Sequence, residues 1–400
     1  MNYILFDDIS YNNLLPLTFS RPVAAIRIGI LTIAEKWEKY LNVKPGYITQ
    51  HYLSLRYKLI SGANNVLING SISPNASLLD KIHALKEHEI LVKGDIIIAF
   101  NASEPKVHKL AAKEMILNED EEIKEYKKIE FEGEIFTVRN TWDIFSKNGQ
   151  AIADDFTLLV KGKISQPISP TNQVIAPQNI FLEEGAKVEC SILNAKDAFI
   201  YIGKDAEIME GSIVRGSFAL CEHSQLKLGA KIYGPTTIGP HSKVGGEVNN
   251  SVIFGYSNKA HDGFLGNAVL GEWCNLGADS NNSNLKNDYS EVKIWDYTKK
   301  GFKATGLQFC GLIMADHSKC GINTMFNTGT VVGFSSNIFG SGFPRNFVPS
   351  FSWGGAAGFT TYKASKAMEV AKLVMSRRNI AFDKAEQAIF EKVFELDHFE

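Results

Sequence analysis

Aliphatic side chains recur at every sixth position over a long stretch in the second half of the chain. They are Ile202, Ile208, Val214, Leu220, Leu226, Ile232, Ile238 and Val244. A helix would give a period near 3.6 residues and a half-buried strand would give alternation, so a period of six fits neither element. It is typical of a parallel β-helix, in which each short strand turns one apolar side chain inward. We therefore predict stacked coils that bury one continuous core.

The same period returns in two later phases. These comprise Phe264, Leu270 and Leu276, and then Met314, Cys320, Phe326, Val332 and Ile338. Glycine often follows the apolar position, as at Gly203, Gly239 and Gly277, and it suits the tight corner between strands. The alternative, a chance run inside a β-sandwich, is disfavoured by so many consecutive matches. Residues 246–263 and 279–305 break the register, and we predict that both are projecting loops.

The first part of the chain alternates short apolar runs with amphipathic stretches. Residues 3–6, 66–68 and 95–100 have the composition of buried strands, whereas residues 28–40 and 77–87 have a helical pattern. Alternation of strands and helices predicts an α/β domain with a Rossmann-like sheet.

Changes in composition divide the chain into four parts. We predict an α/β domain over 1–155, a junction rich in proline, serine and glutamine over 156–180, a β-helix over 181–350 and a helical tail over 360–400. Within the tail, two sets of apolar residues recur at helical spacing, namely Ala364, Met368, Ala371 and Met375, then Phe382, Ala385, Ile389 and Val393. Such stripes predict helices that pack on the β-helix or on a neighbouring subunit.

Composition and charge narrow the class of partner. The 42 basic and 44 acidic residues nearly cancel, so we expect neither nucleic acid nor an anionic membrane as partner. The start, MNYILFDD, lacks the basic segment and long apolar run of a signal peptide, and no stretch approaches the roughly 20 apolar residues of a membrane span. Five cysteines without C-x-x-C spacing favour a reducing compartment. We therefore predict a cytoplasmic protein with small-molecule substrates.

A motif in the second half points to a family. The segment Asn258-Lys259-Ala260-His261 is followed by GFLGNAVLGEWCNLGADSNNSN after one further residue, Asp262. This region resembles the acyltransferase half of the bifunctional N-acetylglucosamine-1-phosphate uridyltransferase/glucosamine-1-phosphate acetyltransferases, and the whole chain resembles a divergent bacterial branch of them. The resemblance implies a left-handed parallel β-helix of hexapeptide repeats, acetyl-CoA as acyl donor, and a homotrimer with the site between subunits.

The resemblance also assigns site residues in the β-helix. It places His261 as general base, Asn275 and Phe264 at sugar-binding positions, and Ala278, Asn284 and Thr328 at acyl-CoA-binding positions; the family has a tyrosine where Phe264 stands. The chemistry is consistent, since imidazole titrates in the range needed to deprotonate an amine, and a backbone N–H near Ala278 could stabilise an oxyanion. The simpler interpretations are a surface histidine for His261 and ordinary turn residues for the asparagines.

Several β-helix enzymes bind zinc through three histidines, so the histidines of the repeat region are candidate zinc ligands. They are His223, His241, His261 and His317. The close histidine pair of the γ-type carbonic anhydrases is missing from this sequence, and we predict no metal site in the β-helix.

The N-terminal half carries a weaker resemblance. The stretch LPLTFSRP at 15–22 resembles the segment after the glycine-rich loop of sugar-phosphate nucleotidyltransferases. That loop is absent here, Val23 stands in place of the usual lysine, and Ser71 in place of the usual magnesium-binding aspartate. The resemblance implies a nucleoside triphosphate and Mg²⁺, and the candidate residues for them are Asp7, Asp8, Arg21, Arg27 and Ser71. The alternative is that Asp7 and Asp8 only terminate the first strand.

These features predict a bifunctional transferase of nucleotide-sugar and cell-envelope precursor synthesis. Its two reactions are acetyl-CoA-dependent N-acetylation of an amino-sugar phosphate and transfer of a nucleotidyl group to a sugar-1-phosphate. One alternative is a nucleotidyltransferase whose β-helix serves only oligomerisation. The other is a non-catalytic binding or scaffold protein. The sugar, the nucleotide base and the acyl group stay open.

Overall fold

A computed structural model describes residues 1–398, and the chain divides into two compact units. Unit 1 comprises residues 1–26, 31–140 and 383–389, and unit 2 comprises 27–30, 141–382 and the described part of 390–400. Each unit therefore collects segments that are distant in the sequence. The four sequence-based domain bounds stay a prediction.

Unit 1 is an α/β fold around a mixed sheet of order β2-β1-β3-β6-β5-β7. The strands are β1 Asn2–Phe6, β2 Gly46–Ile48, β3 Asn64–Asn69, β5 Glu89–Lys93, β6 Ile96–Ser103 and β7 Lys127–Glu130, with a separate pair of β4 Ile72–Ser73 and β8 Phe136–Thr137. The helices are α1 Ser10–Asn13, α2 Ile33–Leu41, α3 Ala76–His83 and α4 Glu104–Ala111. β2, β1 and β3 are parallel, and β6 is antiparallel to β3 and β5. The α/β class predicted from the sequence is confirmed.

Two predicted helices are shorter in the structure. α2 begins at Ile33 rather than at residue 28, because Thr32 caps it in a capping box with Glu35. Gly29, with φ +75°, also lies outside helical backbone angles. α3 ends at His83 rather than at residue 87. The spacing of apolar residues predicted both helices to be longer than the helical backbone in the structure.

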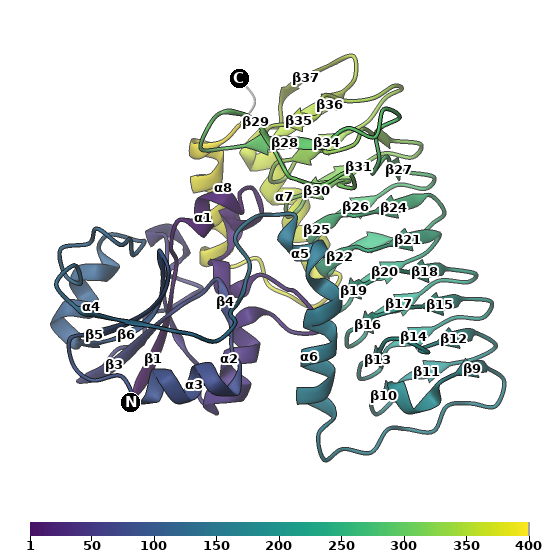
Figure 1. The fold of residues 1–400 in the computed structure, drawn as a ribbon. Helices are drawn as coiled ribbons and strands as arrows, with labels where there is room; N and C mark the ends of the chain where they lie inside the picture. The colour runs from purple at the N-terminus through teal and green to yellow at the C-terminus, as the bar shows by residue number, and fades with distance from the viewer. Residues whose placement is uncertain (399–400) are drawn as a thin grey trace. The chain divides into compact units, whose positions relative to one another are not determined.

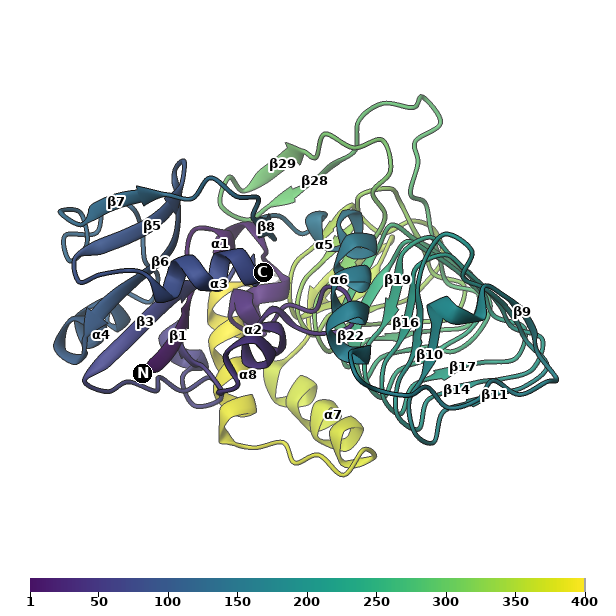
Figure 2. The same ribbon diagram turned by 60° about the horizontal axis from the view of Figure 1, so that its bottom comes forward.

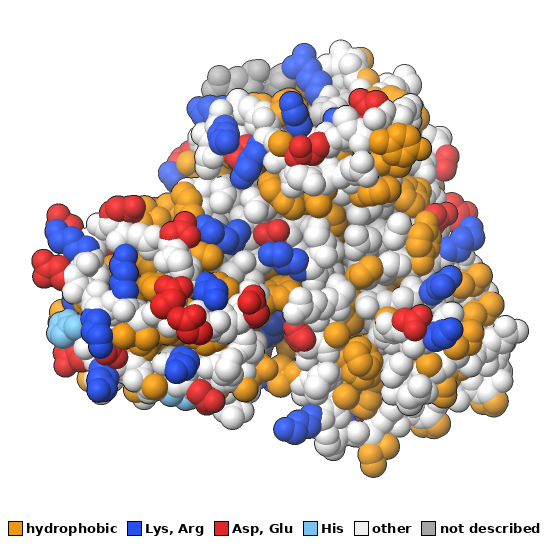
Figure 3. All heavy atoms as spheres, in the orientation of Figure 1, with side chains coloured by type: hydrophobic (Ala, Val, Ile, Leu, Met, Phe, Trp, Pro, Cys, Tyr) orange, Lys and Arg blue, Asp and Glu red, His pale blue; other side chains and the backbone are white. Residues whose placement is uncertain are grey.

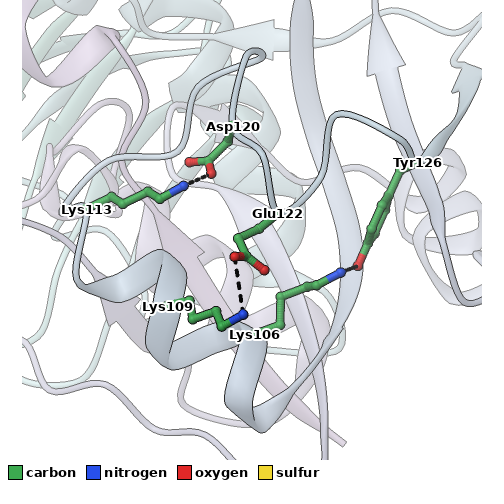
Figure 4. Close-up of polar contacts among 6 residues, drawn as sticks. All are labelled: Lys106, Lys109, Lys113, Asp120, Glu122 and Tyr126. Atoms are coloured by element: carbon green, nitrogen blue, oxygen red, sulfur yellow. Dashed lines mark hydrogen bonds and ion pairs between the residues drawn. The ribbon is translucent and has the colours of Figure 1, made fainter.

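Two lysines of α4 and Lys113, just after the helix, hold the chain that follows (Figure 4). Lys113 pairs with Asp120, and Lys109 lies 3.5 Å from the Glu122 carboxylate. Lys106 donates a 3.0 Å hydrogen bond to the Tyr126 hydroxyl. Because each partner comes from the segment that leads into β7, these contacts fix that segment against the helix.

Unit 2 is a parallel β-helix with three sheets that run along its length (Figures 1 and 2). The first sheet contains β10 Ile180–Leu182, β13 Ile200–Ile202, β16 Phe218–Leu220, β19 Thr236–Ile238, β22 Val252–Gly255, β25 Val269–Glu272, β30 Ile313–Met314, β33 Val331–Val332 and β35 Phe347–Val348. The second contains β11 Lys187–Val188, β14 Glu207–Ile208, β17 Gln225–Leu226, β20 Lys243–Val244, β23 Asn258–Lys259, β26 Asn275–Leu276, β31 Lys319–Cys320, β34 Asn337–Ile338, β36 Ser352–Gly355 and β37 Gly358–Thr361. The third contains β9 Gln173–Ile175, β12 Ile192–Asn194, β15 Ile213–Arg215, β18 Lys231–Tyr233, β21 Glu247–Asn249 and β24 Phe264–Gly266, while β27 Asn281–Asn282 pairs with β32 Met325–Phe326.

The period-six positions form the core of this β-helix. Ile208 pairs with Leu226 and Leu226 with Val244, so equivalent side chains stack from coil to coil. These three are at most 1% exposed and belong to one continuous apolar cluster. Burial of such a column in stacked coils is the main source of stability in a solenoid. The predicted β-helix is therefore confirmed.

Of the two predicted loops, one is wrong and one is correct. Residues 246–263 form β21, β22 and β23, which continue all three sheets. The register breaks because this coil is short: Val244 pairs with Lys259, fifteen residues on, whereas Leu226 pairs with Val244, eighteen residues on. Within residues 279–305, β27 still pairs with β32, and the chain after it leaves the β-helix in the antiparallel hairpin of β28 Lys293–Asp296 and β29 Gly301–Ala304 (Figure 2).

A helix that the sequence analysis did not predict covers the first sheet. α6 Asn148–Val160 follows α5 Asp143–Ser146 and runs beside β16 and β19 (Figure 1). Asn148 accepts a hydrogen bond from Gly29 N–H and donates one to Pro235 O, and Asp155 accepts one from Ile30 N–H. These contacts hold residues 27–30 on the β-helix and give α6 its fixed place.

The chain ends in two helices, as predicted. They are α7 Ala364–Ser376 and α8 Lys384–Leu396. Phe390 packs edge-on against Phe334 and His317 at ring separations of 4.8 and 4.9 Å. After α8, Asp397 accepts hydrogen bonds from Ser350 and Tyr297. The last turn of α8 is thereby bound to the final coils of the β-helix. Among the described residues, no helix has the length and apolar character to cross a membrane.

Candidate functional site

His261 lies at a corner of the β-helix, between β23 in the second sheet and β24 in the third. Its side chain is exposed, and its imidazole has no hydrogen-bond partner among residues 1–398. The backbone of the corner is held from both sides: Glu247 N–H donates to Gly263 O, and Asp279 N–H donates to Asp262 O at 2.9 Å. The structure thus presents a free imidazole on a fixed backbone.

Two glycines allow the coils to meet closely at this corner. Gly246 has φ +72°, and a Cβ on it would come within 2.9 Å of His261 O. Gly263 has φ +117°, and a Cβ there would overlap the Ser280 backbone. Both positions need the left-handed region that glycine adopts without strain. The sequence around His261 therefore specifies a compact corner rather than a mobile loop.

Phe264 and Asn284 lie together beside this corner. A Cβ on Gly266 would overlap the Phe264 ring and come within 2.8 Å of the Asn284 side-chain nitrogen. The Asn281 side chain accepts a 2.7 Å hydrogen bond from Phe264 N–H, and Asn284 donates to the Asn267 side chain. The amide side chains thus complete the hydrogen bonding at the end of the third sheet.

The remaining predicted residues occupy the next coils. Asn275 is exposed on β26, directly beside Asn258 on β23. Ala278 O accepts from Asn323 N–H, and the Ala278 N–H has no acceptor among the described residues. Thr328 shares a 2.8 Å hydrogen bond with Ser283. The structure therefore places the six predicted residues on adjoining coils of unit 2, with His261 and Ala278 between the second and third sheets and Asn284 and Thr328 after β27 and β32.

A groove begins at this edge. Its volume is about 570 Å³, and it is lined by Asp279, Asn281, Ile322, Asn323, Met325, Gly340, Ser341 and Gly342. Asp279 and Asn281 belong to the corner that contacts Asp262 and Phe264. The groove thus runs from the His261 corner towards the last coils, and its size is that of a typical small-ligand site.

The other histidines of the repeat lie at a different corner. His223, His241, Tyr256, Trp273 and His317 stack ring on ring, with centroid separations between 4.4 and 6.1 Å. Each has positive φ between 52° and 62°. Burial lowers the pKa of His241. The described residues contain no group of three or more His, Cys, Asp or Glu arranged to hold a metal ion.

In unit 1, polar residues gather where the parallel strands end. Asp7 and Asp8 follow β1, Thr49 follows β2, and Asn69 and Ser71 lie at the end of β3. Asn69 donates to Asp8 at 2.9 Å and accepts hydrogen bonds from Ser71. Ligands of open α/β sheets bind at the carboxyl ends of the strands, so this is the candidate nucleotide site.

The two aspartates differ in their fitness as Mg²⁺ ligands. Asp7 is 1% exposed, and its oxygens accept from Val23 N–H and the Thr49 hydroxyl. Burial raises the pKa of Asp7 to about 7, against these two hydrogen bonds, which favours the protonated form. Asp8 lies nearer the surface, at 8% exposure, with a single hydrogen bond to each oxygen. Mg²⁺ usually takes one or two carboxylates plus substrate phosphates, and the raised pKa and deeper burial of Asp7 make Asp8 the better candidate ligand of the two.

The two candidate arginines are separated by the structure. Arg21 is buried in unit 1, directly after the 3₁₀ helix Leu17–Ser20. Arg27 lies in unit 2, where it donates to Phe254 O at 3.0 Å and to Ile30 O. Arg27 therefore binds backbone of the β-helix and of its own segment.

The sequence analysis assigned no role to several residues of the candidate nucleotide site and of the His261 corner. Thr49 and Asn69 carry no motif, and only the meeting of parallel strand ends brings them to Asp7 and Asp8. Lys259 had a visible signal: it is a charged residue at an inward position where neighbouring coils have Val244 and Leu276. That break in the apolar column marks the coil of His261.

The fold and the two candidate sites define a two-part protein, with a nucleotidyltransferase-like α/β unit and a hexapeptide β-helix. Residues 3–164 match the family described as sugar nucleotidyl transferase. The resemblance found in the sequence is confirmed, because the chain is also similar to proteins named as bifunctional.

Among these relatives, the bifunctional sugar-1-phosphate nucleotidylyltransferase/acetyltransferase of Sulfurisphaera tokodaii is 27% identical over 217 residues, 53% of this chain and 47% of that protein. The bifunctional protein GlmU of Methanococcus maripaludis is 24% identical over 220 residues, 52% of this chain and 44% of that protein. The chain thus spans about half the length of these curated relatives.

Similar solved structures include the UDP-N-acetylglucosamine acyltransferases of Campylobacter jejuni and Bacteroides fragilis. The first has a TM-score of 0.25 at 13% identity and covers 58% of this chain and 97% of its own. The second has a TM-score of 0.24 at 12% identity and covers 56% of this chain and 96% of its own.

Proposed function

We propose that the chain is a bifunctional sugar enzyme. Unit 2 transfers an acetyl group from acetyl-CoA to the amine of an amino-sugar phosphate, and unit 1 transfers a nucleotidyl group from a nucleoside triphosphate to a sugar-1-phosphate. The relatives named for both activities support this proposal, as does the match of residues 3–164 to the sugar nucleotidyl transferases.

In the acetyl transfer, His261 is the general base. Its imidazole takes the proton of the amine as the nitrogen attacks the thioester carbonyl carbon, and the Ala278 N–H donates to the oxyanion that forms. The C–S bond then breaks, and the proton passes from His261 to the departing thiolate. Asn275 orients the sugar, Phe264 lies beside it, and Asn284 and Thr328 lie on the acyl-CoA side.

The observation that carries this half of the proposal is the His261 corner. An exposed imidazole without a partner lies on a closely packed backbone, and the corner contacts Asp279, which lines a groove of about 570 Å³. A catalytic base needs a free nitrogen and a fixed position, because misplacement by an ångström costs about 100-fold in rate. An ordinary surface histidine, exposed to solvent without a function, would need neither the tight glycine contacts nor the adjoining groove.

In the nucleotidyl transfer, unit 1 binds the triphosphate at the ends of β1, β2 and β3. A phosphate oxygen of the sugar attacks the α-phosphorus, and pyrophosphate leaves. Mg²⁺, when bound, neutralises charge on the phosphates, with Asp8 as its carboxylate ligand. Ser71 and Asn69 keep the Asp8 side chain in place through their shared hydrogen bonds.

An exposed apolar face supports a second copy of the chain as partner. The outward side chains of the third sheet include Ile175, Ile192, Ile213 and Tyr233, each between 36% and 48% exposed. Orange side chains recur along this side of the β-helix in Figure 3, with basic and acidic groups among them. We expect a homotrimer formed through this face, and light scattering on Ile213→Lys should then report a smaller particle than the wild type.

A paired assay tests the two activities separately. Pure protein receives glucosamine-1-phosphate with acetyl-CoA, and free thiol is measured; it then receives N-acetylglucosamine-1-phosphate with each nucleoside triphosphate, and pyrophosphate is measured. Both products are expected. If pyrophosphate forms but thiol does not, the chain is a nucleotidyltransferase whose β-helix serves only oligomerisation. If neither product forms, it is a non-catalytic binding or scaffold protein.

A further inference from the structure

Lys259 places a charged group inside the β-helix directly beneath the His261 corner. It occupies the inward position of β23, where the equivalent residues of the neighbouring coils are Leu226, Val244 and Leu276. Its side chain is 2% exposed. Burying an ammonium group in an apolar core is costly unless its hydrogens are bonded. The sequence therefore carries an energetic penalty at this coil that an aliphatic residue would avoid.

The Lys259 ammonium is bonded to backbone of two successive coils. It donates to His261 O at 2.8 Å and to Gly245 O at 2.9 Å. Both carbonyls belong to corner residues, and the coils are shortened here, since Lys259 pairs with Val244 only fifteen residues away. The ammonium thus supplies the donors that tie the His261 carbonyl to the coil below.

Charged groups near Lys259 favour its protonated form but do not pair with it directly. Burial lowers the pKa of Lys259 to about 8, and Asp262, Cys320 and Asp279 oppose that shift. No carboxylate lies within salt-bridge distance of Lys259 in the described chain. The carbonyls of His261 and Gly245 are consequently the hydrogen-bond partners of the ammonium group. The Lys259 side chain therefore fixes the positions of these two carbonyls.

We infer that Lys259 is a positioning residue that fixes the backbone of His261 from inside the β-helix. This inference rests on the proposed acetyl transfer for its functional consequence. The imidazole has no orienting partner of its own, so its place depends on the backbone. That backbone is set by Lys259 from within and by the Gly246 and Gly263 contacts from outside.

Lys259→Met tests the inference, because methionine fills a similar volume without donors. Two matched controls accompany it. Leu226→Met makes a comparable change in the same inward column, two coils earlier. Lys319→Met removes a half-buried lysine that donates to His317 O. Thermal unfolding of each variant establishes that it is folded.

The first measurement is hydrogen exchange of the peptide that spans 260–264. Lys259→Met should speed exchange at Asp262 to Phe264 about tenfold or more, since the corner loses two charge-assisted hydrogen bonds. Leu226→Met and Lys319→Met should leave this peptide unchanged. Equal exchange in all variants would overturn the inference, whatever the enzyme's activity.

The second measurement is thiol release from acetyl-CoA. Lys259→Met should lower kcat by about 10²-fold with little change in KM for acetyl-CoA, whereas Leu226→Met should match the wild type. Full activity of Lys259→Met, in a protein that His261→Ala inactivates, would overturn the inference and leave the proposed function standing. If the wild type itself releases no thiol, the proposed function fails, and the exchange result still decides the role of Lys259.

Discussion

Replacing Asp7 by asparagine should make unit 1 more stable at neutral and basic pH. Asp7 is almost fully buried, and burial raises its pKa to about 7. The folded carboxyl therefore holds its proton up to that pH, whereas the unfolded carboxyl releases it near pH 4. The contribution of Asp7 to stability is fully present below about pH 4 and is lost as pH rises to about 7.

The magnitude follows from the difference between the folded and unfolded pKa. Each pH unit between them costs about 1.4 kcal/mol, so the wild type should lose about 3 kcal/mol of unfolding free energy between pH 5 and pH 8 through this one group. Asparagine does not titrate. Its oxygen can accept from Val23 N–H, and its amide can donate to the Thr49 hydroxyl, which reproduces the two contacts of Asp7.

Hydrogen exchange of the β1 and β3 peptides at increasing urea concentration reports the stability of unit 1 at each pH. The difference between Asp7→Asn and the wild type should grow from pH 5 to pH 8, and Asp80→Asn, an exposed carboxyl of α3, should follow the wild type throughout. Parallel curves for Asp7→Asn and the wild type would refute the reasoning. Because Asp8 is the proposed Mg²⁺ ligand, Asp7→Asn should also keep pyrophosphate release.

Three further predictions concern unit 2. In the native protein only Cys190 should react with a thiol reagent, since the other four cysteines are buried and burial raises the pKa of Cys274 and Cys310; a second fast-reacting thiol per chain, counted by mass spectrometry, would contradict this. Gly246→Ala should lower stability by about 1–3 kcal/mol in urea unfolding, because its positive φ and its contact with the His261 corner leave no room for a Cβ; unchanged stability would contradict the close packing. Asp397→Ala should speed hydrogen exchange in the last turn of α8, because the bonds to Ser350 and Tyr297 are lost; unaltered exchange would show that the apolar contacts of Phe390 suffice.

The architecture of unit 2 was accessible to sequence reasoning because its repeat is regular. Ile208, Leu226 and Val244 each mark one coil, and the spacing of six leaves few other folds. The reasoning failed at residues 246–263 because a coil can lose three residues and still pair all its strands. A shortened coil and a projecting loop break the period in the same way, and only pairing with the neighbouring strands distinguishes them.

The candidate sites were accessible only in part. Motif spacing singled out residues that lie on adjoining coils, such as Phe264 and Asn284. It could not find Thr49 or Asn69, which reach Asp7 and Asp8 through the parallel pairing of distant strands. It also gave no sign that Arg27 donates a hydrogen bond to Phe254 O of the β-helix. Long-range pairing is the information that local patterns lack.

The account depends most on two separate chemistries in one chain, with His261 serving only the acetyl transfer. The most direct test measures thiol and pyrophosphate release in parallel for His261→Ala and Asp8→Asn. We expect His261→Ala to lose thiol release by at least about 10²-fold while keeping pyrophosphate release, and Asp8→Asn to show the reverse. Undiminished thiol release by folded His261→Ala would contradict the account.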